Sequence, residues 1–445
     1  GGRNMWNTVP NDRIGLEKMR VSDGPGGVRG SKFDGPASMN VPCGTAIAAS
    51  WDTALVRDIG ELLGREVVAK GARVHLSPTI NLHRTPVGGR NFECMSEDPY
   101  LTAITAREYV LGVQSQGVAS CIKHFVGNDT EFERMTIDSQ IDERTLREMY
   151  LLPFEHAVRD AQVMSIMTSY NRINGPYAAD STWLLRDVLR GEWKFDGMVV
   201  SDWFGLHSTV EGVVAGLDLE MPGPTLHRGD ALVAAVERGE VSADLVRDCA
   251  RNILNLMERT GGTGVPPGPE ISRTDADDMA TLRRASSSAM VLLRNKSIGG
   301  TPVLPLDVRG LTSIAVLGPN ASRGMVQGGG SAHVTPTRVS HPLDAITERF
   351  GSAVRIEHSA GCNINKKLPE LDARLLQNVS LDYYRDPAEL DDASAVPAEA
   401  GTTGVFRLLW AGDPLNRREP NFAFGARLAA QLTPDQTGEW VFSIE

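Results

Sequence analysis

Short apolar runs alternate with longer amphipathic stretches through residues 1–262. The runs have the length and content of buried strands, and the stretches between them repeat apolar positions at helical spacing. The predicted strands are Lys18–Val21, Ala46–Ser50, Val74–Ser77, Val118–Lys123, Met164–Tyr170, Met198–Ser201 and Leu217–Met221. The predicted helices include Thr53–Lys70 with Asp52 as its cap, Glu143–Asp160 and Ser242–Arg259.

This alternation predicts an α/β fold, with a (β/α)8-type barrel over residues 1–262. Polar residues lie at or just after the C-terminal ends of the predicted strands, where such barrels keep their chemistry. These residues are Arg90, Lys123, His124, Tyr170 and Asp202. A doubly wound open sheet is the alternative, because the spacing alone does not prove closure.

A second region follows a stretch rich in Gly and Pro, which predicts a linker over residues 263–274. Residues 275–374 return to α/β patterning, with a helix at Asp275–Leu293 and a strand at Ser313–Leu317. Residues 375–445 instead carry β-type patterning between turn residues. Its predicted strands lie in Gly404–Trp410, Phe422–Leu432 and Glu439–Ile444.

The composition, with 41% hydrophobic and 23% charged residues, is that of a soluble globular protein. The net charge is −11 and basic residues form no patch, which disfavours a nucleic-acid partner and suits a neutral substrate. No apolar run reaches the roughly 18 residues of a membrane span. Cytoplasmic residence is expected; a secreted protein with a removed leader is the alternative, since the start at Gly1 looks clipped.

The five cysteines are odd in number and show no Cys-x-x-Cys spacing, so they predict free thiols rather than a disulfide framework or a zinc site. We expect no metal and no organic cofactor. A glycine cluster at residues 328–330 lacks the Lys-Ser/Thr of a phosphate-binding P-loop. It predicts a flexible loop presented to a neighbouring site.

Asp202 is the main candidate for chemistry, because it follows the run Met198–Ser201 and precedes Trp203. A carboxylate at a strand end beside an aromatic ring is able to attack an anomeric carbon. The alternative is a cap for a helix beginning near Leu206. Lys123 and His124 end another strand, where the lysine either forms a Schiff base or binds hydroxyls, and the histidine has a structural alternative.

Two further segments are dense in charged and turn-forming residues. Arg90 is a candidate ligand for vicinal hydroxyls, or the partner of Glu93 and Glu97 in ion pairs. Asp23, in Ser22-Asp-Gly-Pro, either holds an Asx-turn or accepts hydrogen bonds from adjacent sugar hydroxyls.

Five motifs occur in one order along the chain. They are Asp-Gly-Pro-x-Gly-Val-Arg, Gly-Arg-Asn-x-Glu-x-x-Ser-Glu-Asp-Pro, Lys-His-Phe-x-x-Asn-x-x-Glu-x-x-Arg, Met-x-x-Tyr-Asn-x-x-Asn-Gly and Val-Ser-Asp-Trp. With them the chain resembles glycoside hydrolase family 3, specifically its β-glucosidase branch. The resemblance implies a retaining, exo-acting β-glucosidase with Asp202 as nucleophile.

The resemblance also implies a sugar subsite −1. In it Asp23 contacts the far hydroxyls with Arg29 in support, and Trp203 lines the ring. Arg90, Lys123, His124 and Arg134 match other hydroxyl-binding positions of the family, Met167 and Tyr170 match its wall, and Ser331 matches a loop that reaches the site.

Residues 275–374 resemble the first part of the family's α/β sandwich domain, and residues 375–445 the start of an inserted PA14-like β-sandwich. The family's acid/base is a Glu beyond that insert. We therefore assign no acid/base residue in this chain, and we do not give that role to Glu93, Glu97 or Glu131. The expected partners are a small oligosaccharide or glycoside and the remaining C-terminal part of the same enzyme; a homo-oligomer stays open.

Three alternatives remain at this point. A β-N-acetylhexosaminidase of the same broad family usually carries Lys-His-Phe-Pro-Gly-His, whereas this chain has Asn128 where that motif has its last histidine. A fragment that binds sugar without catalysis is the second. A Schiff-base aldolase acting through Lys123 is the third.

Overall fold

The computed structural model describes residues 1–362, 364, 371–403, 414–415, 423–435, 437–440 and 442. The chain divides into two compact units. The first comprises residues 1–316 and 320–357, and the second comprises residues 317–319 and 358–445. Each unit is described by itself.

A parallel sheet of five strands forms the centre of the first unit, in the order β1-β2-β3-β5-β7. The strands are β1 (Val21–Ser22), β2 (Val74–His75), β3 (Ala119–Phe125), β5 (Ser165–Thr168) and β7 (Met198–Val200). Every one of their residues is buried, as expected for a parallel sheet covered on both faces. Leu219 adds one parallel bridge, to Val200.

The N-terminal segment links the two edges of this sheet. The amide of Val21 donates to the carbonyl of Trp6 over 2.9 Å, and the amide of Gly2 donates to the carbonyl of Glu220 over 3.1 Å. The predicted parallel α/β sheet is therefore confirmed. The described residues form a half-barrel, in which the irregular N-terminal segment connects the two edges of the five-stranded sheet. The eight strand–helix repeats of the predicted (β/α)8 barrel are not seen among these residues.

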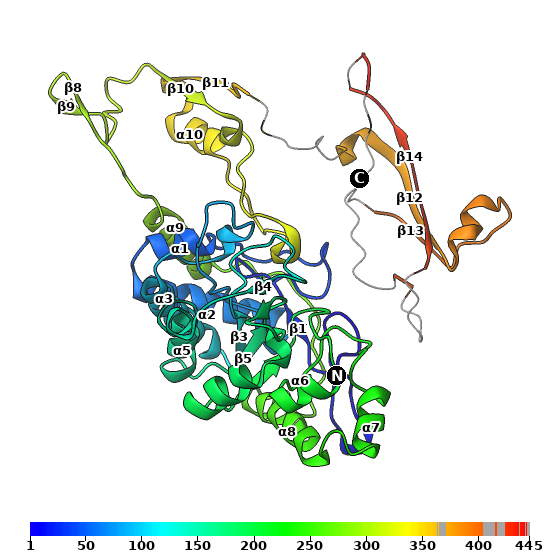
Figure 1. The fold of residues 1–445 in the computed structure, drawn as a ribbon. Helices are drawn as coiled ribbons and strands as arrows, with labels where there is room; N and C mark the ends of the chain where they lie inside the picture. Colours follow the sequence, from blue (N-terminus) through cyan, green and yellow to red (C-terminus); the bar gives the residue numbers. More distant parts are fainter. Residues whose placement is uncertain are drawn as a thin grey trace. The chain divides into compact units, whose positions relative to one another are not determined.

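Helices cover the outer face of the sheet, and α2 packs on α3, which packs on α5 (Figure 1). The helices of this unit are α1 (Gly44–Ala49), α2 (Thr53–Ala69), α3 (Pro99–Gln114), α4 (Glu143–Thr145), α5 (Leu152–Arg159), the π-helix Trp183–Glu192, α6 (Val210–Ala215), α7 (Asp230–Glu237), α8 (Ala243–Arg259), α9 (Ala276–Ser288) and α10 (Pro342–Phe350). Asp52 caps α2 as predicted, with its carboxylate 2.9 Å from the amide of Leu55. Among the described residues, no helix combines the length and apolar content that a membrane crossing needs.

The predicted strand Ala46–Ser50 is wrong, because these residues form α1 and its C-cap. A short apolar run does not distinguish a strand from a buried helical turn, and this one contains several alanines, which favour the helix. The predicted helical stretch Glu143–Asp160 is divided into α4, a π-helical turn at Leu146–Tyr150 and α5.

The predicted linker is held to the rest of the first unit by hydrogen bonds. The amide of Ile271 donates to the carbonyl of Ala69 over 3.0 Å, and Glu270 accepts a hydrogen bond from the amide of Ser31 at 3.1 Å. Because Ser31 lies just after the Asp23–Arg29 loop, the bond to Glu270 helps to hold that loop in place.

The α/β segment after α9 carries short strands: β8 (Ser297–Ile298), β9 (Thr301–Pro302), β10 (Ser313–Leu317) and β11 (Arg355–Ser359). Strand β10 confirms the predicted bounds. No residue of β10 is buried, and Met290 and Leu293 are 79% and 91% exposed. Large apolar side chains with this degree of exposure are unusual in a domain whose hydrophobic core is fully covered.

The second unit contains an antiparallel sheet in the order β13-β12-β14. Its strands are β12 (Leu376–Tyr384), β13 (Glu399–Gly401) and β14 (Gly425–Leu432). The β-type prediction for Phe422–Leu432 is thus confirmed from Gly425 onward. The predicted strand at Gly404–Trp410 lies outside the described residues, as do residues 441, 443 and 444 of the predicted strand Glu439–Ile444.

Candidate active site

The predicted site residues gather at the C-terminal edge of the parallel sheet. Asp23 follows β1, Lys123 and His124 lie near the end of β3, Met167 lies in β5, and Asp202 follows β7. Parallel strands place their carboxyl ends at one edge, so residues far apart in the chain meet there. The contacts described below join all of the predicted residues into one network.

Asp202 is buried, and its two carboxylate oxygens differ. Oδ1 accepts a hydrogen bond from the amide of Trp203 over 2.7 Å. Oδ2 has no hydrogen-bond partner among the described residues, although Nε2 of His124 lies 3.6 Å away. The cap interpretation is wrong, because the next helix, α6, begins only at Val210.

The environment of Asp202 disfavours its charged form. Burial raises the pKa of Asp202 to about 6, although the positive charges of Arg90 and Lys123, the hydrogen bond from the amide of Trp203 and the nearby hydroxyl of Tyr170 oppose this rise. A carboxylate with this pKa is ionised at neutral pH yet poorly solvated. That combination favours attack on an electrophile.

Lys123 and Asp23 form a buried salt bridge, with Nζ 2.6 Å from Oδ1. The same oxygen accepts the amide of the next residue, Gly24, over 2.8 Å. The Asx-turn alternative is wrong, because that turn needs the N–H two residues on, and Pro25 has none. Burial opposes ionisation of Asp23, but the charges of Lys123 and Arg29 outweigh it and hold the pKa of Asp23 below its ordinary value.

Arg29 lies between two aromatic rings. Its guanidinium carbon is 4.5 Å from the ring centre of Trp6 and 4.2 Å from that of Phe33. Nη1 donates to the carbonyl of Ser331, whereas Nε and Nη2 are buried without a hydrogen-bond partner. Buried guanidinium donors without partners are costly, so a polar ligand atom that reached these two nitrogens would bind favourably.

Arg90 is held in a fork by Glu93, with Nε and Nη2 each 2.9 Å from a carboxylate oxygen. The ion pair considered from the sequence is therefore present, and it is buried rather than on the surface. Nη1 of Arg90 lies 3.2 Å from Nε2 of His124. Burial, with the charges of Arg90, Lys123 and Arg134, keeps the pKa of His124 well below 6.5, so this imidazole is neutral.

Tyr170 lies beside Asp202, and Arg134 stacks on the Tyr170 ring. The hydroxyl of Tyr170 donates to the carbonyl of Trp203 over 2.9 Å, and the guanidinium of Arg134 lies 4.8 Å from the centre of the Tyr170 ring. Arg134 also donates to Glu131 over 2.6 Å. Met167 is buried in the same apolar cluster as Trp203.

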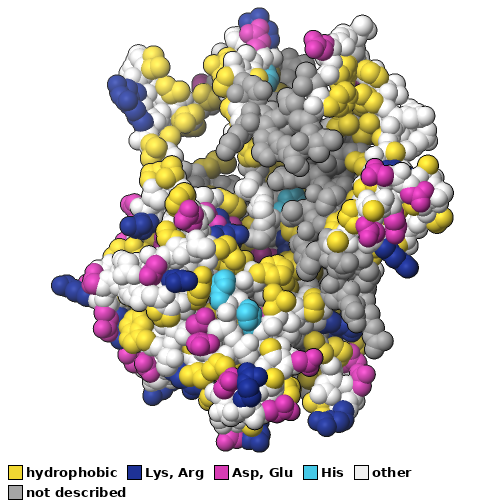
Figure 2. Space-filling model, turned by 45° about the vertical axis from the view of Figure 1, so that its right-hand side comes forward, with side chains coloured by type: hydrophobic (Ala, Val, Ile, Leu, Met, Phe, Trp, Pro, Cys, Tyr) yellow, Lys and Arg dark blue, Asp and Glu magenta, His cyan; other side chains and the backbone are white. Residues whose placement is uncertain are grey.

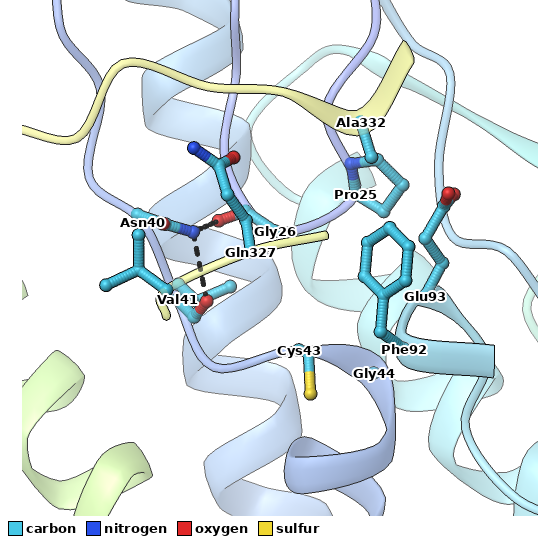
Figure 3. A pocket seen from close by; sticks show the side chains of 11 residues that line it. Pro25, Gly26, Asn40, Val41, Cys43, Gly44, Phe92, Glu93, Gln327 and Ala332 are labelled. Carbon is cyan, nitrogen blue, oxygen red and sulfur yellow. Dashed lines mark hydrogen bonds between the residues drawn. The ribbon is translucent and has the colours of Figure 1, made fainter. Parts of the chain in front are cut away.

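The segment that contains the Gly-rich loop contacts the region that follows β1. Ser331 contacts Arg29 through its peptide carbonyl, and the amide of Ser38 donates to the carbonyl of Thr335 over 2.9 Å. Beside this contact lies a pocket in which the ring of Phe92 points toward Pro25 and Ala332 (Figure 3). A methyl group on Gly328 would overlap that ring, so the loop and Phe92 fit closely.

The named side chains balance in charge. The carboxylates are Asp23, Glu93, Glu131 and Asp202, and the cations are Arg29, Arg90, Lys123 and Arg134. A balanced set of this kind is suited to a neutral ligand rich in hydroxyls. On the face shown in Figure 2, acidic and basic side chains are likewise intermixed. Across the described ranges, no group of three or more His, Cys, Asp or Glu side chains is arranged to hold a metal.

Sequence reasoning missed Trp6, Phe33 and Asn81. The ring of Trp6 lies 5.7 Å from that of Trp203, and Nε1 of Trp203 donates to the carbonyl of Met5 over 2.9 Å. Nothing in the local pattern at residues 5–6 indicates a site, because the contact depends on how the N-terminal segment crosses the sheet edge. Asn81, which hydrogen-bonds the backbone of His124, offered one signal, since it lies after a predicted strand end.

Comparison with known proteins gives two family matches. The model of the glycosyl hydrolase family 3 N terminal domain matches residues 3–256, and that of the glycosyl hydrolase family 3 C-terminal domain matches residues 290–435. The β-glucosidase of Rhizobium radiobacter is 44% identical over 447 residues, which cover 100% of this chain and 53% of the relative. Probable β-glucosidase K of Emericella nidulans is 38% identical over 450 residues, with the same two coverages.

A solved structure is similar as well. The β-glucosidase from Kluyveromyces marxianus in complex with glucose superimposes with a TM-score of 0.82 at 37% identity, covering 91% of this chain and 50% of that one. The chain thus spans about half the length of these relatives. With a family model matched over more than half of its residues, the chain is a member of glycosyl hydrolase family 3.

Proposed function

We propose that this chain carries the sugar-binding and nucleophilic part of a retaining, exo-acting β-glucosidase that removes terminal β-D-glucosyl residues. The observation that carries the proposal is Oδ2 of Asp202, a buried carboxylate oxygen without a hydrogen-bond partner, beside Arg90 and Lys123. The names of the relatives support the substrate class, since one is a β-glucosidase, one is a probable β-glucosidase, and one β-glucosidase structure contains glucose.

In the first step, Oδ2 of Asp202 attacks the anomeric carbon, the glycosidic bond breaks, and the leaving oxygen takes a proton from a general acid. In the second step, water gives a proton to the same group, which now acts as base, and attacks the same carbon while the bond to Asp202 breaks. Positive charge develops on the sugar in both transition states, and the negative charge of Asp202 stabilises it. Arg90 and Lys123 help to keep this carboxylate ionised at neutral pH.

The remaining residues of the proposed subsite −1 bind the sugar. Asp23 accepts hydrogen bonds from hydroxyls, and Lys123, Arg90, Arg134 and the unpartnered nitrogens of Arg29 donate them. His124 contributes a neutral imidazole. The faces of Trp203, Tyr170 and Met167 pack against the ring, and the loop of Ser331 closes one side.

The general acid/base is proposed to be a Glu outside these residues. Glu93 is committed to Arg90 and Glu131 to Arg134, so neither is a free acid. Further polypeptide, a C-terminal part of the same enzyme, is proposed to cover the exposed apolar residues Met290 and Leu293. We propose that residues 275–374 are the first part of an α/β sandwich and that residues 375–445 are the start of a PA14-like insert.

Two measurements test this function. The full-length protein, given a panel of aryl glycosides, should cleave the β-glucoside faster than the β-N-acetylglucosaminide; the reverse order would contradict the proposal. Borohydride trapping should leave Lys123 unmodified, because its Nζ is committed to the 2.6 Å contact with Asp23. A trapped adduct at Lys123 would instead favour the aldolase.

A further inference from the structure

Asn81 holds the backbone of His124 at two points. The amide of His124 donates to Oδ1 of Asn81 over 2.9 Å, and Nδ2 of Asn81 donates to the carbonyl of His124 over 3.0 Å. Both residues are buried. A backbone amide only donates and a backbone carbonyl only accepts, so this pair of bonds fixes which end of the Asn81 side chain is oxygen.

The oxygen so fixed also faces the imidazole of His124, with Oδ1 of Asn81 3.3 Å from Nδ1. Because an amide oxygen only accepts, Nδ1 carries the proton. A neutral imidazole has one N–H, which leaves Nε2 as an acceptor. The other neighbour agrees, since Nη1 of Arg90, which only donates, lies 3.2 Å from Nε2.

The position of the imidazole proton affects the carboxylate of Asp202. Nε2 of His124 is 3.6 Å from Oδ2 of Asp202, the oxygen without a hydrogen-bond partner. With the proton on Nε2, His124 would donate to that oxygen and reduce its nucleophilicity. With the proton on Nδ1, Oδ2 stays free to react.

We propose that Asn81 is a positioning residue that fixes the Nδ1–H tautomer of His124, which directs Nε2 to Arg90 and keeps the imidazole proton away from Oδ2 of Asp202. The chain of contacts runs from Asn81 through His124 to Arg90. The inference deepens the proposed function, because its consequence assumes that Asp202 is the nucleophile. The tautomer itself is independent of that assumption.

Neutron diffraction of the full-length protein in deuterated buffer tests the tautomer without any activity measurement. A deuteron on Nδ1 of His124 and none on Nε2 is the expected result. A deuteron on Nε2 would overturn the proposal, whatever the enzyme hydrolyses.

The variant Asn81→Asp tests the consequence by its pH dependence. A carboxylate against Nδ1 raises the pKa of His124 and makes an imidazolium whose Nε2–H faces Asp202 and is repelled by Arg90, with Lys123 and Arg134 nearby. The ratio of variant to wild-type kcat/KM for an aryl glucoside should be at least about tenfold lower near pH 6 than near pH 8.5, where the imidazole is neutral again.

Asn174→Asp is the matched control. Asn174 clamps the backbone of Ile141 with the same two bonds, at 2.9 and 2.7 Å, where no imidazole is involved in the clamp. Its ratio to wild type should not change with pH. An equal pH dependence in both variants, or a flat ratio for Asn81→Asp, would overturn the positioning role. Absence of glucosidase activity in the wild type would instead contradict the proposed function and leave the neutron result to decide the tautomer.

Discussion

Lys123 and Asp23, which lie 100 residues apart in the sequence, meet in a buried salt bridge of 2.6 Å at the C-terminal edge of the sheet. The contact joins the loop after β1 to the end of β3. It orients a carboxylate and an ammonium group toward the same space, where both are proposed to bind sugar hydroxyls.

Asp23→Asn should therefore lower both activity and stability. Loss of the charge leaves Lys123 buried without its partner, which costs about 3 kcal/mol or more in unfolding free energy. The double variant Asp23→Asn with Lys123→Met should recover much of the stability but none of the activity. Denaturant unfolding and kcat/KM measure the two effects. Recovery of activity in the double variant would show that the pair is only structural.

Trp6 should contribute to the site although no motif contains it. Trp6→Leu removes the face beneath Arg29 and the contact with Trp203, and kcat/KM should fall about tenfold, in line with cation–π and aromatic contacts of about 1 kcal/mol each. Trp6→Phe, which keeps an aromatic face, should retain most of the activity. Equal losses in both variants would argue against the stacking role.

Asp202→Asn should stabilise the fold while it abolishes turnover. The folded pKa of about 6 lies above the ordinary value of 3.8, so the ionised form costs stability above pH 6, and this cost is relieved as pH falls from 6 toward 3.8. The gap corresponds to roughly 3 kcal/mol at about 1.4 kcal/mol per pKa unit. The melting temperature of Asp202→Asn should therefore rise at pH 7.5.

Asp218 provides the control for that experiment. Burial also raises the pKa of Asp218 to about 6, but its carboxylate accepts bonds from Arg190 and from the amide of Val199, both at 2.7 Å. The same linkage favours Asp218→Asn, but a neutral amide does not replace the bonds from both Arg190 and Val199, so its melting temperature should rise less than that of Asp202→Asn. A fall in the melting temperature of Asp202→Asn, or a larger rise in Asp218→Asn, would contradict the unfavourable ionisation assigned to Asp202.

The same ionisation should set the acidic limb of the rate profile. Only the carboxylate form of Asp202 attacks, so kcat/KM should fall about tenfold per pH unit below a limb near pH 6. The charge of Arg90 lowers this pKa, and Arg90→Met should move the limb to higher pH as well as reduce activity. A limb unchanged by that substitution would mean that another group titrates.

Much of the first unit was predictable from the sequence, because the patterns that indicate its helices and strands are local. The cap at Asp52, the helices α2 and α8 and the buried strands follow from periodicity and capping residues within a few positions. The short run at Ala46–Ser50 was misread because it has too few residues to show a period. Local pattern also gave no account of residues 1–6, whose bonds go to β1 and to Glu220 on the far edge.

The site residues were predictable as a set through their ordered motifs, but their partners were not. Glu93 binds Arg90 from three positions away, which the sequence suggests, whereas Asn81 reaches His124 through the pairing of neighbouring strands. The unpartnered state of Oδ2 of Asp202 depends on every neighbour at once. Only the three-dimensional arrangement contains that information.

The most direct test of the central proposal is covalent trapping of the full-length protein with a 2-deoxy-2-fluoro-β-glucoside that carries a good leaving group. The fluorine slows hydrolysis of the glycosyl-enzyme, so the sugar stays attached to the nucleophile. Peptide mass spectrometry should find the label on Asp202, and Asp202→Asn should take up none. A label on any other carboxylate, or labelling that persists in Asp202→Asn, would contradict the account.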